Sequence, residues 1–232
     1  PLIVPSLLAR PDAAAADQTQ AQTRAGALPR QQPRIDVVLL SWRNAAKSRR
    51  ALQALHNCGY PNLRLVVVDN GSDDGAADEV AEALSELFPD ATLVRSPQNL
   101  GYPAGMNLGL RQARSVPGAT YFCLLANDVA VQPGAFEALV ARCEADPTIG
   151  LCGATQHHLA DDGTVVRTIP GGVRYVPALG WNVSVRSMEP AVVERRMNAL
   201  QGAAVFGTTA FLDAVGPMGT DRFVYFEEAE WA

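Results

Sequence analysis

The sequence lacks the features that mark secreted disulfide-rich, membrane-spanning and nucleic-acid-binding proteins. It has only 4 cysteines in 232 residues, and no two of them form a C-x-x-C pair, so neither a disulfide framework nor a zinc site is expected. No apolar run approaches the roughly 18 residues that a membrane-spanning helix needs. Its 19 basic residues are outnumbered by 24 acidic ones, and this deficit of positive charge argues against a nucleic-acid partner.

Two phosphate-binding motifs and a secretion signal are also absent. No G-x-G-x-x-G follows the first predicted strand, and no G-x-x-x-x-G-K-[ST] occurs anywhere, which argues against a dinucleotide-binding Rossmann domain and a P-loop. Residues 1–10 lack the basic start and apolar core of a signal peptide, so we expect a cytoplasmic location. What remains, 48% hydrophobic and 19% charged residues, is ordinary for a globular chain.

Composition divides the chain into a leader and one domain. Residues 11–33 are rich in Ala, Gln, Pro and Thr and hold too little apolar surface to offset the entropy of ordering. We therefore expect residues 1–33 to be a flexible leader and residues 34–232 to form the domain. The apolar segment 1–8 has an alternative interpretation as a short segment that docks on this or another chain.

From residue 34 onward, apolar β-branched runs alternate with segments of helical periodicity. Strands are expected at 35–40, 63–68, 91–95, 119–125 and 149–155, and helices at 44–56, 76–88, 103–114 and 133–144, the last with Pro133 at its first position. This order predicts an α/β fold with a mostly parallel central sheet flanked by helices.

The alternation stops after residue 156. Irregular hairpins and loops are expected up to about residue 189, followed by a segment at 200–205 that rejoins the sheet and a short helix at 208–215. The chain ends at Ala232 inside a segment with the pattern of a helix start, which predicts a domain truncated at its C terminus.

Four successive predicted strands are followed by polar loops, two of which contain glycine. In parallel sheets, ligands bind where such loops converge at the carboxyl ends of the strands. Each loop alone has a structural alternative: Asp-Asn-Gly-Ser is a common turn and helix cap, and glycines four residues apart allow a helix to pack closely on a sheet. Together they suit a polar, phosphorylated ligand. Their sequences are 41–44 Ser-Trp-Arg-Asn, 69–75 Asp-Asn-Gly-Ser-Asp-Asp-Gly, 99–109 Asn-Leu-Gly-Tyr-Pro-Ala-Gly-Met-Asn-Leu-Gly and 126–128 Ala-Asn-Asp.

In this order the loops resemble glycosyltransferase family 2, in particular its rhamnosyltransferase-like members. The resemblance continues through Gly-Ala-Ala-Val-Phe at 202–206, Val-Gly-Pro at 215–217 and Phe-Val-Tyr-Phe-Glu-Glu-Ala-Glu-Trp at 223–231. It implies a GT-A fold, with a nucleotide-binding half at about 34–130 and an acceptor half at about 131–232.

The resemblance also implies roles for residues of these loops. Asp69 reads the nucleotide base, and Ser41 and Trp42 line the same pocket. The residues expected near the nucleotide and the sugar are Asn99, Gly101, Gly105, Asn107 and Asn127. The last acid of the family's D-x-D metal motif matches Asp128, where a divalent cation, Mg²⁺ or Mn²⁺, would meet the diphosphate; the first acid of that motif is replaced here by Ala126.

The acidic pair Glu227–Glu228 matches the family's Glu-Asp pair. The resemblance assigns the catalytic base to Glu228, which would take the proton of the acceptor hydroxyl as it attacks. The alternative is an acidic start of a solvated helix, because carboxylates favour the positive end of the helix dipole.

The resemblance implies an inverting transferase that moves a sugar from a nucleoside-diphosphate donor to an acceptor hydroxyl. Cell-surface polysaccharide or glycolipid assembly is the implied setting, with a saccharide or lipid-linked acceptor and peripheral association with the inner face of the cell membrane. A nucleotide-sugar-binding module that has lost catalysis is the alternative within the fold. A nucleotidyltransferase is a third hypothesis, which the lack of glycine in the first loop disfavours.

Overall fold

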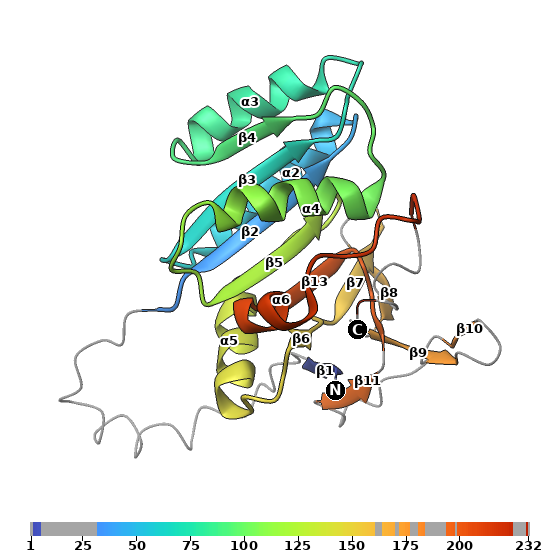
Figure 1. Cartoon of the computed structure of the whole chain (residues 1–232). Helices are drawn as coiled ribbons and strands as arrows, with labels where there is room; N and C mark the ends of the chain where they lie inside the picture. Colours follow the sequence, from blue (N-terminus) through green and yellow to red (C-terminus); the bar gives the residue numbers. More distant parts are fainter. Residues whose placement is uncertain are drawn as a thin grey trace.

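A computed structural model describes residues 2–5, 32–160, 164–169, 172–176, 181–183, 194–197, 199–224 and 231. Within these residues, an eight-stranded sheet runs through the centre of the molecule in the order β11-β1-β6-β13-β5-β2-β3-β4 (Figure 1). Neighbours among the last four strands are parallel: β2 (Ile35–Ser41), β3 (Leu63–Asp69), β4 (Thr92–Arg95) and β5 (Tyr121–Ala126). This confirms the predicted α/β class with a mostly parallel sheet.

The other half of the sheet mixes directions. Strand β13 (Ala204–Thr208) lies antiparallel between β5 and β6 (Leu151–Cys152). Strand β1 (Leu2–Pro5) pairs in parallel with β6 and antiparallel with β11 (Glu194–Met197). A strand that comes late in the chain therefore separates β5 from β6, although those two are consecutive along the chain.

Helices cover both faces of the sheet (Figure 1). One face packs against α2 (Ala45–Cys58), α3 (Ala76–Leu87) and α5 (Ala135–Ala145), and the other against α4 (Tyr102–Arg114) and α6 (Thr209–Val215). Along β2, Val37 and Leu39 belong to the first core and Val38 and Leu40 to the second. All seven residues of β2 are buried, as expected for a parallel strand covered on both sides.

Five of the strands after β6 form two small separate sheets, in agreement with the expected break in the alternation. Strands β7 (Gln156–Leu159) and β8 (Val165–Ile169) make a two-stranded sheet. Strands β9 (Gly172–Val176), β10 (Trp181–Val183) and β12 (Ala199–Leu200) make a three-stranded one. No helix in the described part of the chain is both long and apolar enough to cross a membrane.

Three local expectations need correction. Helix α5 begins after Gly134, whose φ of 81° only glycine adopts easily, so Pro133 lies in the preceding turn rather than at the first helical position. The segment that rejoins the main sheet is Ala204–Thr208, because Ala199–Leu200 pairs with β9 instead. Finally, Leu2–Pro5 of the expected leader form a strand of the main sheet, in line with the docking alternative.

The cysteines behave as small apolar residues. Cys58, Cys123, Cys143 and Cys152 are all buried, and none of them forms a disulfide, as expected from their spacing. Burial raises the pKa of the Cys58 and Cys123 thiols, whereas a hydrogen bond with Cys152 lowers the pKa of Cys143.

Candidate active site at the carboxyl edge of the sheet

The register of the parallel strands brings the predicted loops to one edge of the sheet. Ser41 at the end of β2 pairs with Asp69 at the end of β3, and Leu40 pairs with Ala126 at the end of β5. The Asn70 N–H donates to the Ser41 carbonyl at 2.8 Å, which holds the loops after β2 and β3 together. The first, second and fourth polar loops therefore leave the sheet side by side.

The loop after β2 has an unusual backbone. Arg43 and Asn44 have φ values of 54° and 52°, in the left-handed region that residues with a side chain rarely occupy. The next loop holds this conformation: the Arg43 N–H donates to Ser72 Oγ at 2.8 Å and the Asn44 N–H to Asp74 Oδ2 at 3.3 Å. Strain of this kind gathers at functional sites.

Trp42 is the aromatic side chain of this loop. Its exposed fraction is 46%, high for a large ring, and the Arg43 guanidinium lies 5.0 Å from the ring centroid. Arg43 also donates to Asp73 at 2.9 Å. The ring is therefore supported on one side by a cation that is itself anchored.

Asp69 is a buried acid whose contacts come from the backbone. Its side chain is 4% exposed, and both carboxylate oxygens lie 3.4 Å from the Ser72 N–H. Within the described residues, no basic side chain forms an ion pair with it. A buried carboxylate with weak contacts of this kind retains the capacity to accept further hydrogen bonds.

Asn70 joins this loop to the third one, a role that the sequence did not single out. Its amide donates to Asn99 Oδ1 and to the Gly101 carbonyl, both at 3.0 Å, and its oxygen accepts from the Leu100 N–H at 3.0 Å. Asn99 Oδ1 also accepts from the Gly101 N–H at 2.9 Å. The Asn99 side chain thus shapes the loop in front of α4.

Gly101 and Gly105 are required by close contacts within the protein. Gly101 has a φ of 79°, and a Cβ there would lie 2.4 Å from the carbonyl oxygen of Phe223. A Cβ on Gly105 would lie 2.7 Å from Leu40 Cδ1 and 3.1 Å from Asn70 Nδ2. Both glycines therefore allow α4 to begin close against its neighbours, which is the packing alternative for this spacing.

Asn107 holds a segment that is distant in the sequence. It is 4% exposed, its amide donates to the Met218 carbonyl at 2.8 Å, and its oxygen accepts from the Met218 N–H at 3.1 Å. Both polar atoms of the side chain are satisfied by the same residue, 111 positions later in the chain. In the structure Asn107 is a tertiary clamp.

The turn after β5 contains the predicted metal ligand. Asn127 donates to Ser48 Oγ at 3.0 Å, and Ser48 Oγ lies 2.8 Å from Ser41 Oγ, so the turn is linked to α2 and β2. The Asp128 carboxylate lies 3.8 Å from the Lys47 ammonium. No cluster of three or more His, Cys, Asp or Glu side chains suited to a metal occurs in the described portion of the chain.

Glu227 and Glu228 lie outside the described residues. The segment that leads to them reaches the candidate site, because the carbonyl of Phe223 accepts from the N–H of Tyr102, the first residue of α4, at 2.8 Å. After the acidic pair, Trp231 donates to the Gly216 carbonyl at 2.9 Å. The chain on either side of the pair is therefore fixed to the domain.

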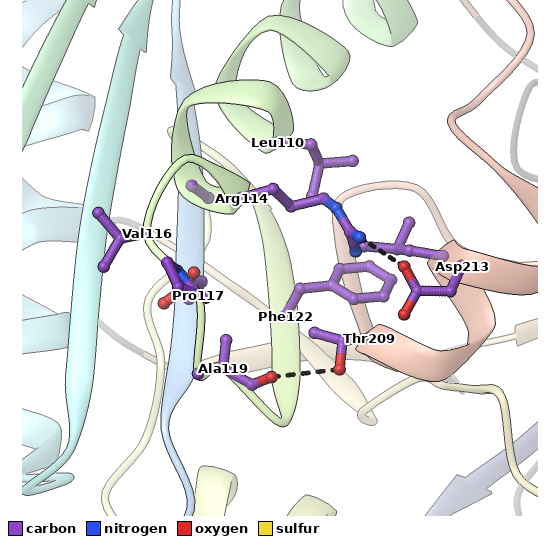
Figure 2. A pocket seen from close by; sticks show the side chains of 12 residues that line it. Leu110, Arg114, Val116, Pro117, Ala119, Phe122, Thr209 and Asp213 are labelled. Atoms are coloured by element: carbon purple, nitrogen blue, oxygen red, sulfur yellow. Dashed lines mark hydrogen bonds and ion pairs between the residues drawn. The ribbon is translucent and has the colours of Figure 1, made fainter.

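A pocket occurs at the opposite edge of the sheet, near the start of β2 and β5 (Figure 2). Asp36 lines it, five residues before Ser41, which corresponds to about 17 Å along a strand. Figure 2 shows Arg114 directed at Asp213 across the pocket and the Thr209 hydroxyl bonded to the Ala119 carbonyl. Its charged groups are matched within the protein, and it lies apart from the candidate site.

Comparison with known proteins agrees with this geometry. The family described as "Glycosyl transferase family 2" matches residues 36–199, more than half of the chain. A curated relative, the N-acetylglucosaminyl-diphospho-decaprenol L-rhamnosyltransferase of Mycobacterium tuberculosis, is 24% identical over 215 residues, which cover 84% of this chain and 68% of the relative.

Solved glycosyltransferase structures share the fold. A mannosyltransferase of Pyrobaculum calidifontis, in complex with GDP-Man and Mn²⁺, superposes with a TM-score of 0.61 at 18% identity and covers 92% of this chain and 56% of its own. S. aureus TarS residues 1–349, in complex with UDP, gives a TM-score of 0.55 at 15% identity and covers 85% and 53% of the two chains. The chain thus spans about half the length of these structures. The matched region, the loop motifs and the shared GT-A fold together show that this chain belongs to glycosyltransferase family 2.

Proposed function

We propose that the chain transfers a sugar from a nucleoside-diphosphate donor to an acceptor hydroxyl with inversion at the anomeric carbon. The observation that carries the proposal is Asp69, a buried acid with weak backbone contacts at the carboxyl edge of a GT-A sheet. An exposed aromatic ring, Trp42, stands on the neighbouring loop. A carboxylate beside an accessible ring suits a nucleotide base, which offers N–H donors at its edge and a flat face.

The donor would occupy the half of the domain at about 34–130. Asp69 would accept a hydrogen bond from the base, and Ser41 and Trp42 would line the base pocket. The Asn70 amide bonds to Asn99 and Gly101 and holds their loop next to the loop of Asp69. Asn99 and Gly101 would therefore lie beside the ribose and the diphosphate. Gly105 and Asn107 would act indirectly, by fixing the start and the position of α4.

A divalent cation suits the turn after β5. Mg²⁺ and Mn²⁺ prefer oxygen ligands, and Mg²⁺ is often held by one or two carboxylates together with substrate phosphates. Asp128 would supply the carboxylate and Asn127 lies beside it, so the residues present fit a cation held mainly by the donor. Such a cation stabilises the negative charge that develops on the leaving diphosphate.

The acceptor would enter from the half at about 131–232. Glu228 would take the hydroxyl proton, with Glu227 beside it. The name of the curated relative includes a saccharide that is linked to decaprenol through a diphosphate. This name supports a polyprenyl-linked acceptor, and with it cell-surface polysaccharide assembly and peripheral contact with the membrane. The Phe223 carbonyl, four residues before Glu227, accepts from the Tyr102 N–H at the start of α4, which supports an acidic segment close to the donor loops.

The test is a thermal-shift panel with UDP, dTDP and GDP, each with and without Mn²⁺. A ligand that binds only the folded state raises the unfolding midpoint by mass action, so one of the three should raise it more than the other two, and more with Mn²⁺. Nucleoside monophosphates provide the control for base recognition without the second phosphate. An unchanged midpoint with all three diphosphates would contradict the proposal.

The alternative is a module of the same fold that binds the nucleotide sugar without transferring it. Two observations favour it: one candidate metal carboxylate in place of two, and the pairing of that carboxylate with Lys47. Hydrolysis of the donor discriminates between the two functions. A protein that binds the diphosphate tightly and releases no sugar, with or without acceptor, is the module.

A further inference from the structure

Lys47 is a cation at the candidate diphosphate position that no sequence motif identifies. It lies in the first turn of α2, and its Nζ is 3.8 Å from Asp128 Oδ2. The next residue, Ser48, is fully buried and accepts a hydrogen bond from Asn127. The start of α2 and the turn after β5 are thus joined side by side, and Lys47 is positioned against Asp128 by the fold.

The ion pair between Lys47 and Asp128 is weak, so another anion can easily replace Asp128 at the ammonium. The two side chains are 51% and 55% exposed, and ion pairs at such exposure contribute little to stability. Two other basic side chains at this edge pair with carboxylates of their own: Arg43 with Asp73, and Arg95 at the end of β4 with Asp78. Of these three cations, Lys47 is the one that pairs with the proposed cation ligand.

We propose that Lys47 binds the donor diphosphate, and that its ammonium exchanges Asp128 for a phosphate oxygen when the donor enters. This inference rests on the proposed function and extends it. A diphosphate carries more negative charge than one carboxylate, so it competes effectively for the ammonium. Asp128 released in this way is free to ligate a cation, and two positive charges then share the leaving group. A second acid in the metal motif would help to hold a cation and so bring positive charge to the diphosphate. Lys47 supplies part of that positive charge directly.

The first test compares Lys47→Gln with Arg49→Gln as the matched control. Arg49 is on the same helix, is equally exposed at 51% and also pairs with a carboxylate, Glu86 at 3.5 Å. Binding of UDP, dTDP and GDP is measured by calorimetry in EDTA. Lys47→Gln should weaken metal-free binding of the preferred diphosphate by about tenfold to a hundredfold, the range for one charge-assisted hydrogen bond. Lys47→Gln should leave binding of the corresponding nucleoside unchanged.

The second test uses Asp128→Asn alone and together with Lys47→Gln. If Asp128 and the diphosphate compete for Lys47, Asp128→Asn should strengthen metal-free binding, and the double variant should lose this gain. Equal losses in Lys47→Gln and Arg49→Gln, or a gain that persists in the double variant, would overturn the inference. If the unmodified protein binds none of the three diphosphates with or without Mn²⁺, both the inference and the proposed function fail. If it binds one and Lys47→Gln binds it equally well, only the inference fails.

Discussion

Buried acids stand at both ends of the parallel strands, and they are matched in different ways. At the amino end of β2, Asp36 accepts from Arg34 Nε at 3.0 Å and lies 3.7 Å from Arg64 Nη1. Both arginines are themselves anchored, since Arg34 donates to the Val116 carbonyl at 2.6 Å and Arg64 to the Ala113 carbonyl at 2.5 Å.

At the carboxyl end the charges are left more open. Asp69 is as buried as Asp36, yet its contacts are two 3.4 Å approaches from one backbone N–H. Asp128 is half exposed and shares one lysine at 3.8 Å. A charge that is matched by anchored partners serves the fold, and one that is matched weakly is available to a ligand. The comparison therefore distinguishes the amino edge of the sheet, where the acid is matched within the protein, from the carboxyl edge, where the candidate site lies.

The largest effect is expected at Glu228, which extends the comparison to the acidic segment after Phe223. Glu228→Gln keeps the shape but removes the proton acceptor, so sugar transfer should fall by roughly 10²–10⁴-fold. Donor binding should persist, because the proposed base acts on the acceptor hydroxyl and not on the diphosphate. Transfer is measured with the donor that the panel identifies, and Glu227→Gln is the control. A large loss at Glu227 with none at Glu228 would reassign the base, and losses under tenfold at both would support the acidic helix start.

The second prediction compares the buried acids of the two edges directly. Asp36→Ala leaves Arg34 and Arg64 without their shared carboxylate, so the free energy of unfolding should fall by about 1–3 kcal/mol with nucleotide affinity unchanged. Asp69→Ala should do the reverse: a loss of at least about tenfold in nucleotide affinity, worth about 1.4 kcal/mol, with little change in stability. Urea unfolding and calorimetry measure the two quantities. If Asp69→Ala unfolds the domain while affinity persists, Asp69 belongs to the structural class.

The third prediction tests whether Asn107 of α4 stabilises the fold or contacts the substrate. Asn107→Ala removes both hydrogen bonds to the Met218 backbone, so the unfolding free energy should fall by about 1–3 kcal/mol. Nucleotide affinity should stay within about twofold, since both polar atoms of the side chain already bond to the Met218 backbone. Leu108→Ala on the same helix, a partly buried apolar residue, serves as a packing control. A selective loss of affinity with unchanged stability would restore the direct contact with substrate that the family resemblance implies.

The smallest effect is a pH dependence at the amino edge. Burial raises the pKa of Asp36 above its usual value of 3.8, although Arg34 and Arg64 oppose the shift. The folded state then holds this proton more tightly than the unfolded state, so the contribution of Asp36 to stability is full below about pH 4 and declines as pH rises through the raised pKa. Asp36→Asn should lack this decline. Urea unfolding of both proteins from pH 4 upward measures it, and parallel curves would contradict the raised pKa.

Much of the fold and part of the site followed from the sequence because they rest on local pattern. Strands such as Ile35–Ser41 are buried on both faces and are therefore continuous apolar runs. Asp69 and Asp128 were identified because each lies in a polar loop that follows such a run, where ligand sites of parallel sheets form. The family resemblance added roles to these positions, and the roles of the individual residues stay predictions.

The tertiary structure decided what depends on contacts between distant segments. The sequence alone did not indicate that Asn107 would hold Met218, that Gly101 would meet Phe223, or that β13 would enter the sheet between β5 and β6. Each of these contacts joins residues far apart in the chain, and its geometry depends on how every intervening element packs. The pairing of Lys47 with Asp128 is of the same kind. The sequence by itself determined which polar and charged residues stand in the loops. Only the packed fold decided which of their charges are matched within the protein and which remain available to a ligand.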